Sequence, residues 1–217
     1  MISLSLQSSS HCVSVAIYKN KRLIYDIQNK ENDTNRSEQV ILLIERSLQK
    51  IGFQKIDEII ISRGPGSFTS IRAQISIAQG LALAFNAKIK TVDTFQVLIS
   101  SDDFSKKNCV TIFKESRQEY YCQSFKKVEC TWKKDCSLKA INENTIKKLL
   151  LEKFENQFDG DFFVVTDYAY PIFKDFLSKK FDIRIINISA QNVFSASKKK
   201  FASRSTTPLY FFKHYAK

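Results

Sequence analysis

One stretch of the chain has the residue types and the spacing of an anion-binding turn. Residues 62–72 read SRGPGSFTSIR, directly after the β-branched run EIII and before a long helical pattern of small residues. A strand, a Gly-rich turn and a helix in this order place free backbone N–H groups where they can hold a phosphate. The lysine of a Walker A loop is missing, because GPGSFTSIR contains no Gly-Lys-Ser/Thr. The turn therefore either binds an anion or only connects a strand to a helix.

Both interpretations use the same residues, which we call the signature turn: Gly64, Pro65, Gly66, Ser67, Phe68, Thr69 and Arg72. Phosphate binding would use the helix N-terminus, with Arg72 as an added positive charge. A plain turn would use Pro65 to fix φ and Gly66 to take a positive φ. Ser67 would then cap the helix. The chemistry of these residues alone favours capping and leaves phosphate binding as the alternative.

Few other residues of the chain could carry out catalysis or bind a metal. It has only two histidines, His11 and His214, and five cysteines, and contains no HExxH, CxxC or GxSxG motif. We therefore expect no catalytic residue and no metal site. An apolar run of about 18 residues, long enough to span a membrane, is also missing, as is the pattern of a signal peptide. We expect a cytoplasmic protein with reduced thiols and no membrane association.

The net charge of +12 is spread unevenly along the chain. After Asp182 there is no Asp or Glu, but there are seven Lys and Arg residues. Such asymmetry indicates an anionic partner, nucleic acid first. The candidate tRNA contacts are Lys198, Lys199, Lys200 and Arg204. The alternative is a solvated, lysine-rich surface, which is favoured slightly because no RNA-binding motif accompanies the charge.

Hydrophobic patterning predicts the elements that must position these residues. In the first hundred residues, strand patterns at 2–8, 12–18, 22–28, 56–62 and 87–92 combine with helical patterns at 37–50, 70–86 and from residue 94. Further strands are predicted at 110–116, 118–127, 128–134, 161–167 and 182–188, and helices at 142–156, 170–180 and 190–203. Each half begins with strands and then alternates helix and strand, which requires parallel pairing in an α/β fold. We predict two similar halves, 1–100 and a smaller 101–217 that includes the basic C-terminal helix and tail.

Two of the predicted helices carry more apolar surface than one buried face needs. In 37–50, Val40, Ile44 and Leu48 form one stripe with Ile41, whereas Leu42 and Leu43 fall outside it. In 70–86, small residues recur every fourth position and form a smooth ridge that lets another helix approach closely. The helices are either deeply buried within the chain or form an interface with another protein, which we favour. The candidate partner-binding residues are Val40, Leu42, Leu43, Ile75, Ser76, Gly80, Leu81, Leu83 and Ala84.

The stretch RGPGSFTSIRAQISIAQGLALAF resembles the RGPGSFTG-[LV]-R…GLA signature of the TsaB (YeaZ) family. Further similar segments are MISLSLQSSSHCVSVAIY, RSEQVILLIERSL, TVDTFQVL, FKESRQEYYCQSF and STTPLYFF. The resemblance touches most of the chain. It is specific in the first hundred residues and loose after about residue 125.

The resemblance implies the actin-like/sugar-kinase/Hsp70 (ribonuclease H-like) fold, with two subdomains that each contain a mixed sheet flanked by helices. It implies a non-catalytic scaffold for a TsaD-type paralogue, bound through the helices at 37–50 and 70–86. With a TsaE-type ATPase, that complex makes N6-threonylcarbamoyladenosine at position 37 of tRNAs that read ANN codons. It also implies that this chain itself requires no cofactor, that ATP or ADP binds only in the complex, and that tRNA is reached through the complex.

Several residues depart from the family pattern. The aspartate of the first turn is Gln7, the glycine after Phe-Thr is Ser70, and the histidine that opens the first helix is Arg36. The final Leu-Arg is Phe211-Phe212. An uncharged Gln7 argues against an independent kinase, because active relatives of the fold position Mg²⁺ and phosphate with that aspartate. The alternatives kept open are an ATP-dependent small-molecule kinase or peptidase of the same fold, a stand-alone RNA-binding module at 184–217, and a homodimer of the free chain.

Overall fold

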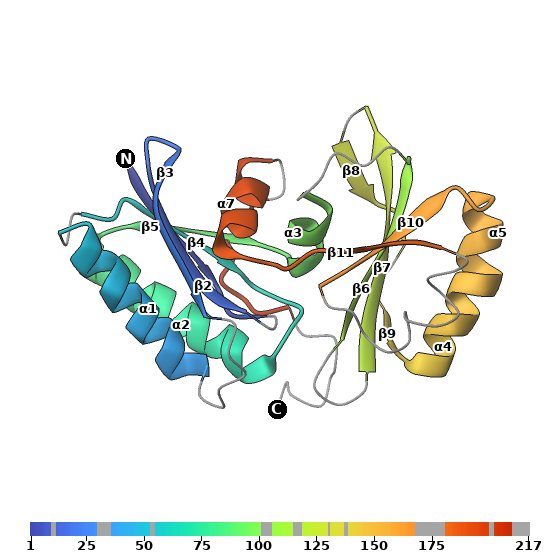
Figure 1. Cartoon of the computed structure of the whole chain (residues 1–217), viewed down its shortest axis with the longest axis horizontal. Coiled ribbons are helices and arrows are strands. Elements are labelled where there is room, and N and C mark those ends of the chain that lie inside the picture. The colour runs from blue at the N-terminus through green and yellow to red at the C-terminus, as the bar shows by residue number, and fades with distance from the viewer. Residues whose placement is uncertain are drawn as a thin grey trace. The chain divides into compact units, whose positions relative to one another are not determined.

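The computed structural model describes residues 1–9, 12–29, 36–52, 55–100, 106–114, 119–129, 131–136, 139–167, 181–199 and 202–209. These residues form two compact units (Figure 1). The first unit contains residues 1–100 together with 187–209, and the second contains the chain between them. The predicted division placed the C-terminal basic helix in the second half. The structure instead assigns this helix, α7 (Ala190–Lys198), to the first unit, because it packs on the first sheet.

The first unit is built on a five-stranded mixed sheet of order β3-β2-β1-β4-β5. Its strands are β1 (Ile2–Gln7), β2 (Val13–Lys19), β3 (Arg22–Asn29), β4 (Glu58–Ser62) and β5 (Lys88–Val92). The first three are antiparallel neighbours, whereas β4 and β5 run parallel to β1. The helices are α1 (Arg36–Lys50), α2 (Phe68–Phe85), α3 (Thr94–Ser100) and α7. These elements confirm the predicted order of strands and helices in the first hundred residues.

The alternation of residues in β1 decides what covers each face of this sheet. Leu4 and Leu6 join the buried core formed with α1 and α2, which lie side by side on one face (Figure 1). The intervening serines point to the other face, where the Ser5 hydroxyl donates to the Ala190 carbonyl of α7 at 2.7 Å. The sequence ISLSLQ therefore specifies one apolar face for two helices and one small, polar face for α7.

The second unit repeats this plan with a six-stranded mixed sheet, in which β11-β10-β6-β7-β8 are in order and β9 also pairs with β7. Its strands are β6 (Asn108–Lys114), β7 (Glu119–Val128), β8 (Thr131–Lys134), β9 (Lys139–Asn142), β10 (Phe162–Thr166) and β11 (Asp182–Ile185). The antiparallel β6, β7 and β8 correspond to β1, β2 and β3, and the parallel β10 and β11 to β4 and β5. The two similar halves predicted from element order are thus confirmed by sheet order.

One helical segment covers a face of the second sheet. It runs without a break through α4 (Glu143–Lys148), the π-helical η1 (Leu149–Phe154) and α5 (Glu155–Phe158). Ile146, Leu150, Phe154 and Phe158 recur every fourth residue and form the core with Val110, Ile112 and Val164. Strand β9 was not predicted, and the helix predicted at 170–180 lies outside the described residues. No helix in the described part of the chain is long and apolar enough to cross a membrane.

Candidate functional site

The signature turn is fixed against the residues that follow β1. Gly66 has a φ of +157°, and a Cβ placed on it would lie 2.4 Å from the carbonyl oxygen of Ser9. The same oxygen accepts a hydrogen bond from the Ser67 backbone N–H at 3.2 Å. Only glycine fits at position 66, because any side chain would displace this contact. The Gly64–Pro65 peptide bond is cis, and Gly64 has a φ of +106°.

Ser67 does not cap α2 through its side chain, so that part of the prediction is wrong. Its hydroxyl instead accepts a hydrogen bond from Ser70 Oγ at 3.0 Å. The Arg72 guanidinium lies 4.1 Å from the centroid of the Phe68 ring, on the first turn of the helix. The turn therefore engages its own backbone and side chains, and Thr69 and Arg72 are exposed on the outer side.

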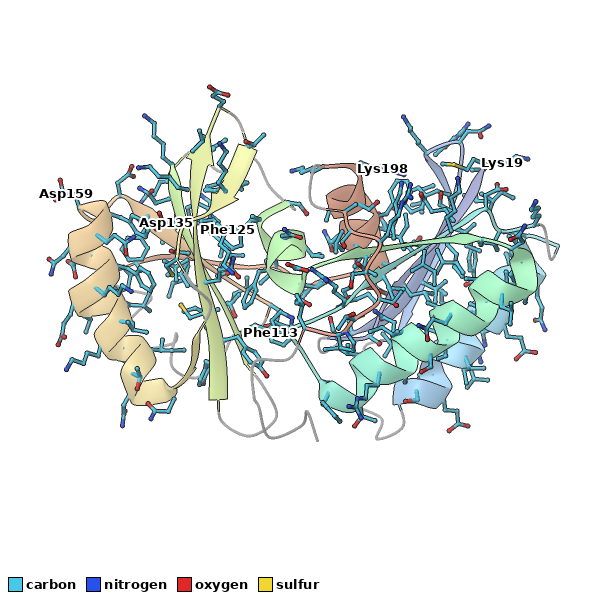
Figure 2. The ribbon with its side chains drawn as sticks, turned by 180° about the vertical axis from the view of Figure 1, so that it is seen from behind. Lys19, Phe113, Phe125, Asp135, Asp159 and Lys198 are labelled. Carbon is cyan, nitrogen blue, oxygen red and sulfur yellow. The ribbon has the colours of Figure 1, made fainter. Side chains whose placement is uncertain are left out.

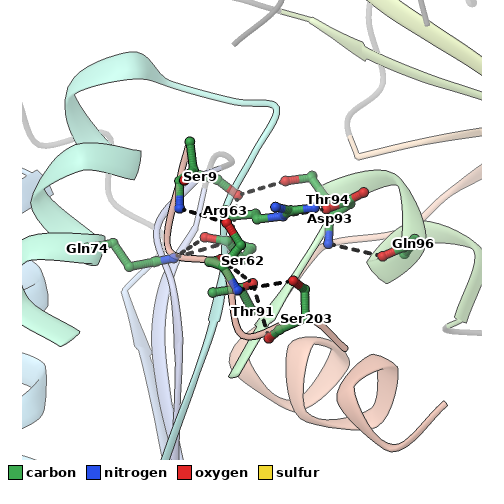
Figure 3. A network of polar contacts seen from close by, with 11 residues as sticks. Ser9, Ser62, Arg63, Gln74, Thr91, Asp93, Thr94, Gln96 and Ser203 are labelled. Atoms are coloured by element: carbon green, nitrogen blue, oxygen red, sulfur yellow. Dashed lines mark hydrogen bonds and ion pairs between the residues drawn. The ribbon is translucent and has the colours of Figure 1, made fainter. Parts of the chain in front are cut away.

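A buried network of neutral polar side chains lies beneath the turn (Figure 3). Gln7 Nε2 donates to Ser9 Oγ at 2.9 Å, and Gln7 Oε1 accepts from Ser62 Oγ at 2.6 Å. The Ser9 hydroxyl also lies 3.1 Å from that of Ser62 and 3.5 Å from that of Thr94. These four residues are buried, and an amide fits here because it donates to one neighbour while it accepts from another. An aspartate at position 7 could accept but not donate.

Gln74 of α2 extends the same network to the strand and the turn. Its Nε2 donates to the Ser62 carbonyl at 2.6 Å, and its Oε1 accepts from Ser8 Oγ at 2.9 Å. The Ser8 hydroxyl also lies 3.2 Å from the carbonyl of Ser70. The sequence analysis missed Gln74. The spacing of Gln74 could have identified it, because it lies three residues after Ile71 and four before Ala78, and all three are buried on one face of the helix. A buried amide requires hydrogen-bond partners.

An ion pair and the C-terminal segment close the end of this region. Arg63 Nε donates to Asp93 Oδ1 at 2.8 Å, directly beside the turn (Figure 3). Thr91 of β5 forms a two-way backbone bridge with Ser203 at 2.8 Å. The Leu209 N–H donates to the Arg63 carbonyl at 2.9 Å. Residues 203–209 thus fasten the chain along β5 and the turn.

The predicted partner-binding residues of α1 and α2 form two groups, one buried in the core of the first unit and one accessible on the outer faces of the helices. Val40, Leu43 and Ile75 are only 2%, 5% and 6% exposed and belong to the core of the first unit, so for these three the prediction is wrong. Burial in α1 alternates in pairs of residues, which places Leu43 inward and Ile41 outward. Leu81 is partly buried against the same core. The sequence analysis grouped Ile41 with Val40, Ile44 and Leu48 and left Leu43 out of this stripe. In the structure, Leu43 belongs to the buried stripe and Ile41 does not.

The remaining candidates are accessible. Leu42 is 43% exposed and Leu83 is 87% exposed; Ile41, which was not among the predicted partner-binding residues, is 55% exposed. Ser76, Gly80 and Ala84 form an exposed ridge at four-residue spacing along α2. A Cβ placed on Gly80 would meet nothing within 4 Å. We call these six residues of α1 and α2 the outer helix face: they combine large apolar side chains with a smooth, low ridge.

Comparisons with known proteins identify the family. A TsaB protein of Buchnera aphidicola subsp. Acyrthosiphon pisum, named tRNA threonylcarbamoyladenosine biosynthesis protein TsaB, is 30% identical over 159 residues, which are 71% of this chain and 70% of the relative. The chain belongs to the TsaB family. The TsaB protein of Haemophilus influenzae is 33% identical over 82 residues, or 36% of this chain and 34% of the relative. A family model described as TsaD, tRNA N6-adenosine threonylcarbamoyltransferase, matches residues 30–151.

The solved structure of YeaZ from Pseudomonas aeruginosa superposes with a TM-score of 0.72 at 15% identity. The match covers 97% of this chain and 99% of YeaZ. The likeness shows the fold: two units, each with a mixed sheet flanked by helices, of the actin-like/sugar-kinase/Hsp70 class. The TsaB signature in this chain is thus the turn and helix α2 of the first unit, directly over the network of Gln7.

Two of the candidate tRNA contacts of this TsaB-family chain, Lys198 and Lys199, are engaged within the first unit. Lys198 Nζ lies 3.5 Å from Glu58 Oε2, and Lys199 Nζ donates to the Ser100 carbonyl at 3.0 Å. Burial by itself raises the pKa of Glu58, but its hydrogen bond with Lys90 and the charges of Lys90 and Lys198 outweigh burial, so its pKa is lowered. Arg204 is exposed, and Lys200 lies outside the described residues. Lys198 therefore helps to hold α7 on its sheet, and Lys199, directly after the helix, contacts the last residue of α3.

Proposed function

We propose that this chain is a non-catalytic scaffold subunit in tRNA threonylcarbamoyladenosine biosynthesis and binds a TsaD-type ligase through the outer helix face. The observation that carries the proposal is the exposure of large apolar side chains on two adjacent helices, of which α2 bears the family signature. The name of the TsaB relatives supports the pathway. The similarity of residues 30–151 to the TsaD family model supports a paired arrangement of two related chains.

The chemistry of the outer helix face supports a helix-packing partner. Ile41, Leu42 and Leu83 expose apolar surface, and burying a fully exposed side chain of this size contributes about 1.5–3 kcal/mol. Leu83 is 87% exposed, whereas Ile41 and Leu42, at 55% and 43%, would contribute about half of that each. Beside them, the ridge of Ser76, Gly80 and Ala84 lets a helix axis approach to roughly 8 Å. Large apolar side chains together with a row of small residues form a surface against which another helix can pack.

The region beneath the signature turn supports a scaffold rather than a catalyst. The side chains of Gln7, Ser9 and Ser62 carry no charge and satisfy one another, and the carboxylate of Asp93 beside the turn is paired with Arg63. A phosphoryl-transfer site needs charged groups that hold Mg²⁺ and phosphate. The chemistry is therefore assigned to the partner. A TsaE-type ATPase and tRNA would join the cytoplasmic complex, and ATP or ADP would bind only there.

Co-purification with the cognate TsaD-type protein tests the interface. The double variant Leu42→Glu/Leu83→Glu should weaken the complex on the order of a hundredfold, because it removes apolar contact and buries two unpaired charges. Ile185→Glu is the matched control, since Ile185 is 51% exposed but lies in β11 of the second unit. The control should change affinity less than about twofold. Association that survives the double variant would place the interface elsewhere.

The free chain and the enzyme alternative have separate tests. Sedimentation of the isolated chain will decide whether the outer helix face pairs with a second copy, and Leu83→Glu should then convert a dimer into a monomer. Incubation of the isolated chain with ATP or peptides tests catalysis. Turnover that is lost in Ser67→Ala would support the kinase or peptidase instead of the scaffold.

A further inference from the structure

The β7–β8 hairpin of the second unit carries exposed lysines whose side chains make no ion pair or hydrogen bond with the part of the chain that the structure describes. Lys126 and Lys133 are direct cross-strand partners in this antiparallel pair, and both are exposed. Lys134 follows and is exposed as well. Like charges directly opposite one another destabilise a sheet. We call Lys126 and Lys133, which share one face of the sheet, the hairpin lysines; Lys134, in register with Phe125, lies on the other face. Phe125 and Asp135, which lie together at the open end of the paired strands, are labelled in Figure 2.

The hairpin lysines differ from the lysines of α7 in their surroundings. Within the described residues, no ion pair or hydrogen bond involves their side chains. Asp135, two residues after Lys133, accepts instead from neutral donors, Gln157 Nε2 at 2.6 Å and Ser124 Oγ at 3.3 Å. The Lys127 N–H donates to the Lys107 carbonyl at 2.7 Å, which brings the exposed Lys107 to the same end of the sheet.

Protection of a sheet edge does not explain the whole cluster. Lysines on an edge strand deter pairing with other chains, and β8 is such an edge. Lys126, however, lies on β7 between β6 and β8, where it is in register with Asn108 on one side and Lys133 on the other. A lysine there protects no edge. The repulsion that it adds requires another reason.

A buried aromatic side chain anchors the hairpin in the second unit. Trp132 is buried and contacts Phe163 edge-on, with ring centroids 5.9 Å apart. Lys127 Nζ lies 5.9 Å from the centroid of the Trp132 ring. Strands hold opposite side chains about 5 Å apart at their Cβ atoms, so the positive charges are held close together before any partner arrives.

From these observations we infer that the hairpin lysines form a binding surface for the phosphate backbone of RNA. Lysine binds phosphate as a point charge and needs no fixed geometry. A lipid surface fits less well, because peripheral membrane sites combine basic with apolar side chains. Among the described residues, none of the exposed large apolar side chains lies in this hairpin. The choice of RNA as the polyanion rests on the proposed function.

The test compares two double variants of the full chain with equal loss of charge. Lys126→Gln/Lys133→Gln removes the cross-strand pair, and Lys148→Gln/Lys153→Gln removes two exposed lysines from the helical segment of the same unit. The probe is a fluorescent tRNA transcript titrated at several salt concentrations. The hairpin variant should raise Kd roughly tenfold and lower the slope of log Kd against log salt by about 2, one for each lysine. The control should change Kd less than about twofold.

Other outcomes overturn the inference. Equal effects of both double variants would mean that only net charge matters, and no effect of the hairpin variant would remove the surface altogether. Loss of binding to phosphatidylserine vesicles, with tRNA binding intact, would assign the surface to lipid and refute RNA. The hairpin variant should still co-purify with the TsaD-type protein. Failure of the wild-type chain to co-purify, with hairpin-dependent tRNA binding intact, would refute the scaffold proposal and leave this one standing.

Discussion

The underside of the signature turn and the α2 part of the outer helix face belong to one stretch of sequence, yet they differ in how their groups are satisfied. Beneath the turn, Gln74 and Ser62 find hydrogen-bond partners inside the first unit. On the outside, Leu83 is almost fully exposed and Gly80 faces open space. The difference teaches that the buried polar residues of the signature complete the fold, whereas Leu83 and Gly80 remain accessible on its outer side.

Among the variants that test this comparison, Gly66→Ala should have the largest effect on stability. The added methyl group would lie 2.4 Å from the Ser9 carbonyl oxygen, at a φ of +157° that L residues rarely adopt. We expect a loss of about 3 kcal/mol in the free energy of unfolding, measured by urea denaturation. A loss under about 1 kcal/mol would mean that the turn is not fixed against Ser9.

Gln74→Leu should have the next largest effect. It keeps the size of the side chain but leaves the Ser8 hydroxyl and the Ser62 carbonyl without this partner in a buried site. Unsatisfied buried groups cost about 1–3 kcal/mol each, so we expect a loss of roughly 2–3 kcal/mol. Gln79→Leu, on the exposed side of the same helix, is the control and should change stability by less than about 0.5 kcal/mol. Equal losses in both variants would contradict a special role for the network.

Gly80→Ala should give the smallest change in stability. Its effects on the stability of the free chain and on partner binding should have opposite signs. In the free chain the methyl group meets nothing, and replacing a helical glycine should stabilise the fold by about 0.5–1 kcal/mol. If a partner helix packs on the ridge, the same methyl group should weaken binding to the TsaD-type protein. Thermal unfolding and a binding titration measure the two effects. Higher stability with unchanged affinity would move the partner away from Gly80.

Much of this arrangement was predictable from local pattern. The strand, turn and helix at 58–85 and the repeated order of elements follow from hydrophobic period and from glycine placement. The assignment of α7 to the first unit was not predictable, because it depends on a contact between Ala190 and Ser5 across most of the chain. Likewise, Ile41 and Leu43 have similar side chains, and only packing against the sheet decides which of the two is buried.

The same distinction applies to charge. The candidate tRNA contacts were predicted at 198–204 because no acidic residue is close to them in the sequence. In the structure, Lys198 pairs with Glu58, which is distant in the chain. The sequence did not indicate a charged cluster at the hairpin lysines, because they are separated along the chain and Glu129 lies between them. Cross-strand pairing brings Lys126 opposite Lys133 and leaves both without a counter-charge among the described residues.

The sequence by itself determined the family, the α/β order of elements and the glycine turn, because each is written in neighbouring residues. Only the tertiary structure decided which apolar side chains remain exposed, which lysines remain unpaired and how Gln7 is satisfied. Those outcomes depend on groups far apart in the chain. Burial and pairing are properties of a position in space, so they become defined only when the sheets bring those groups together.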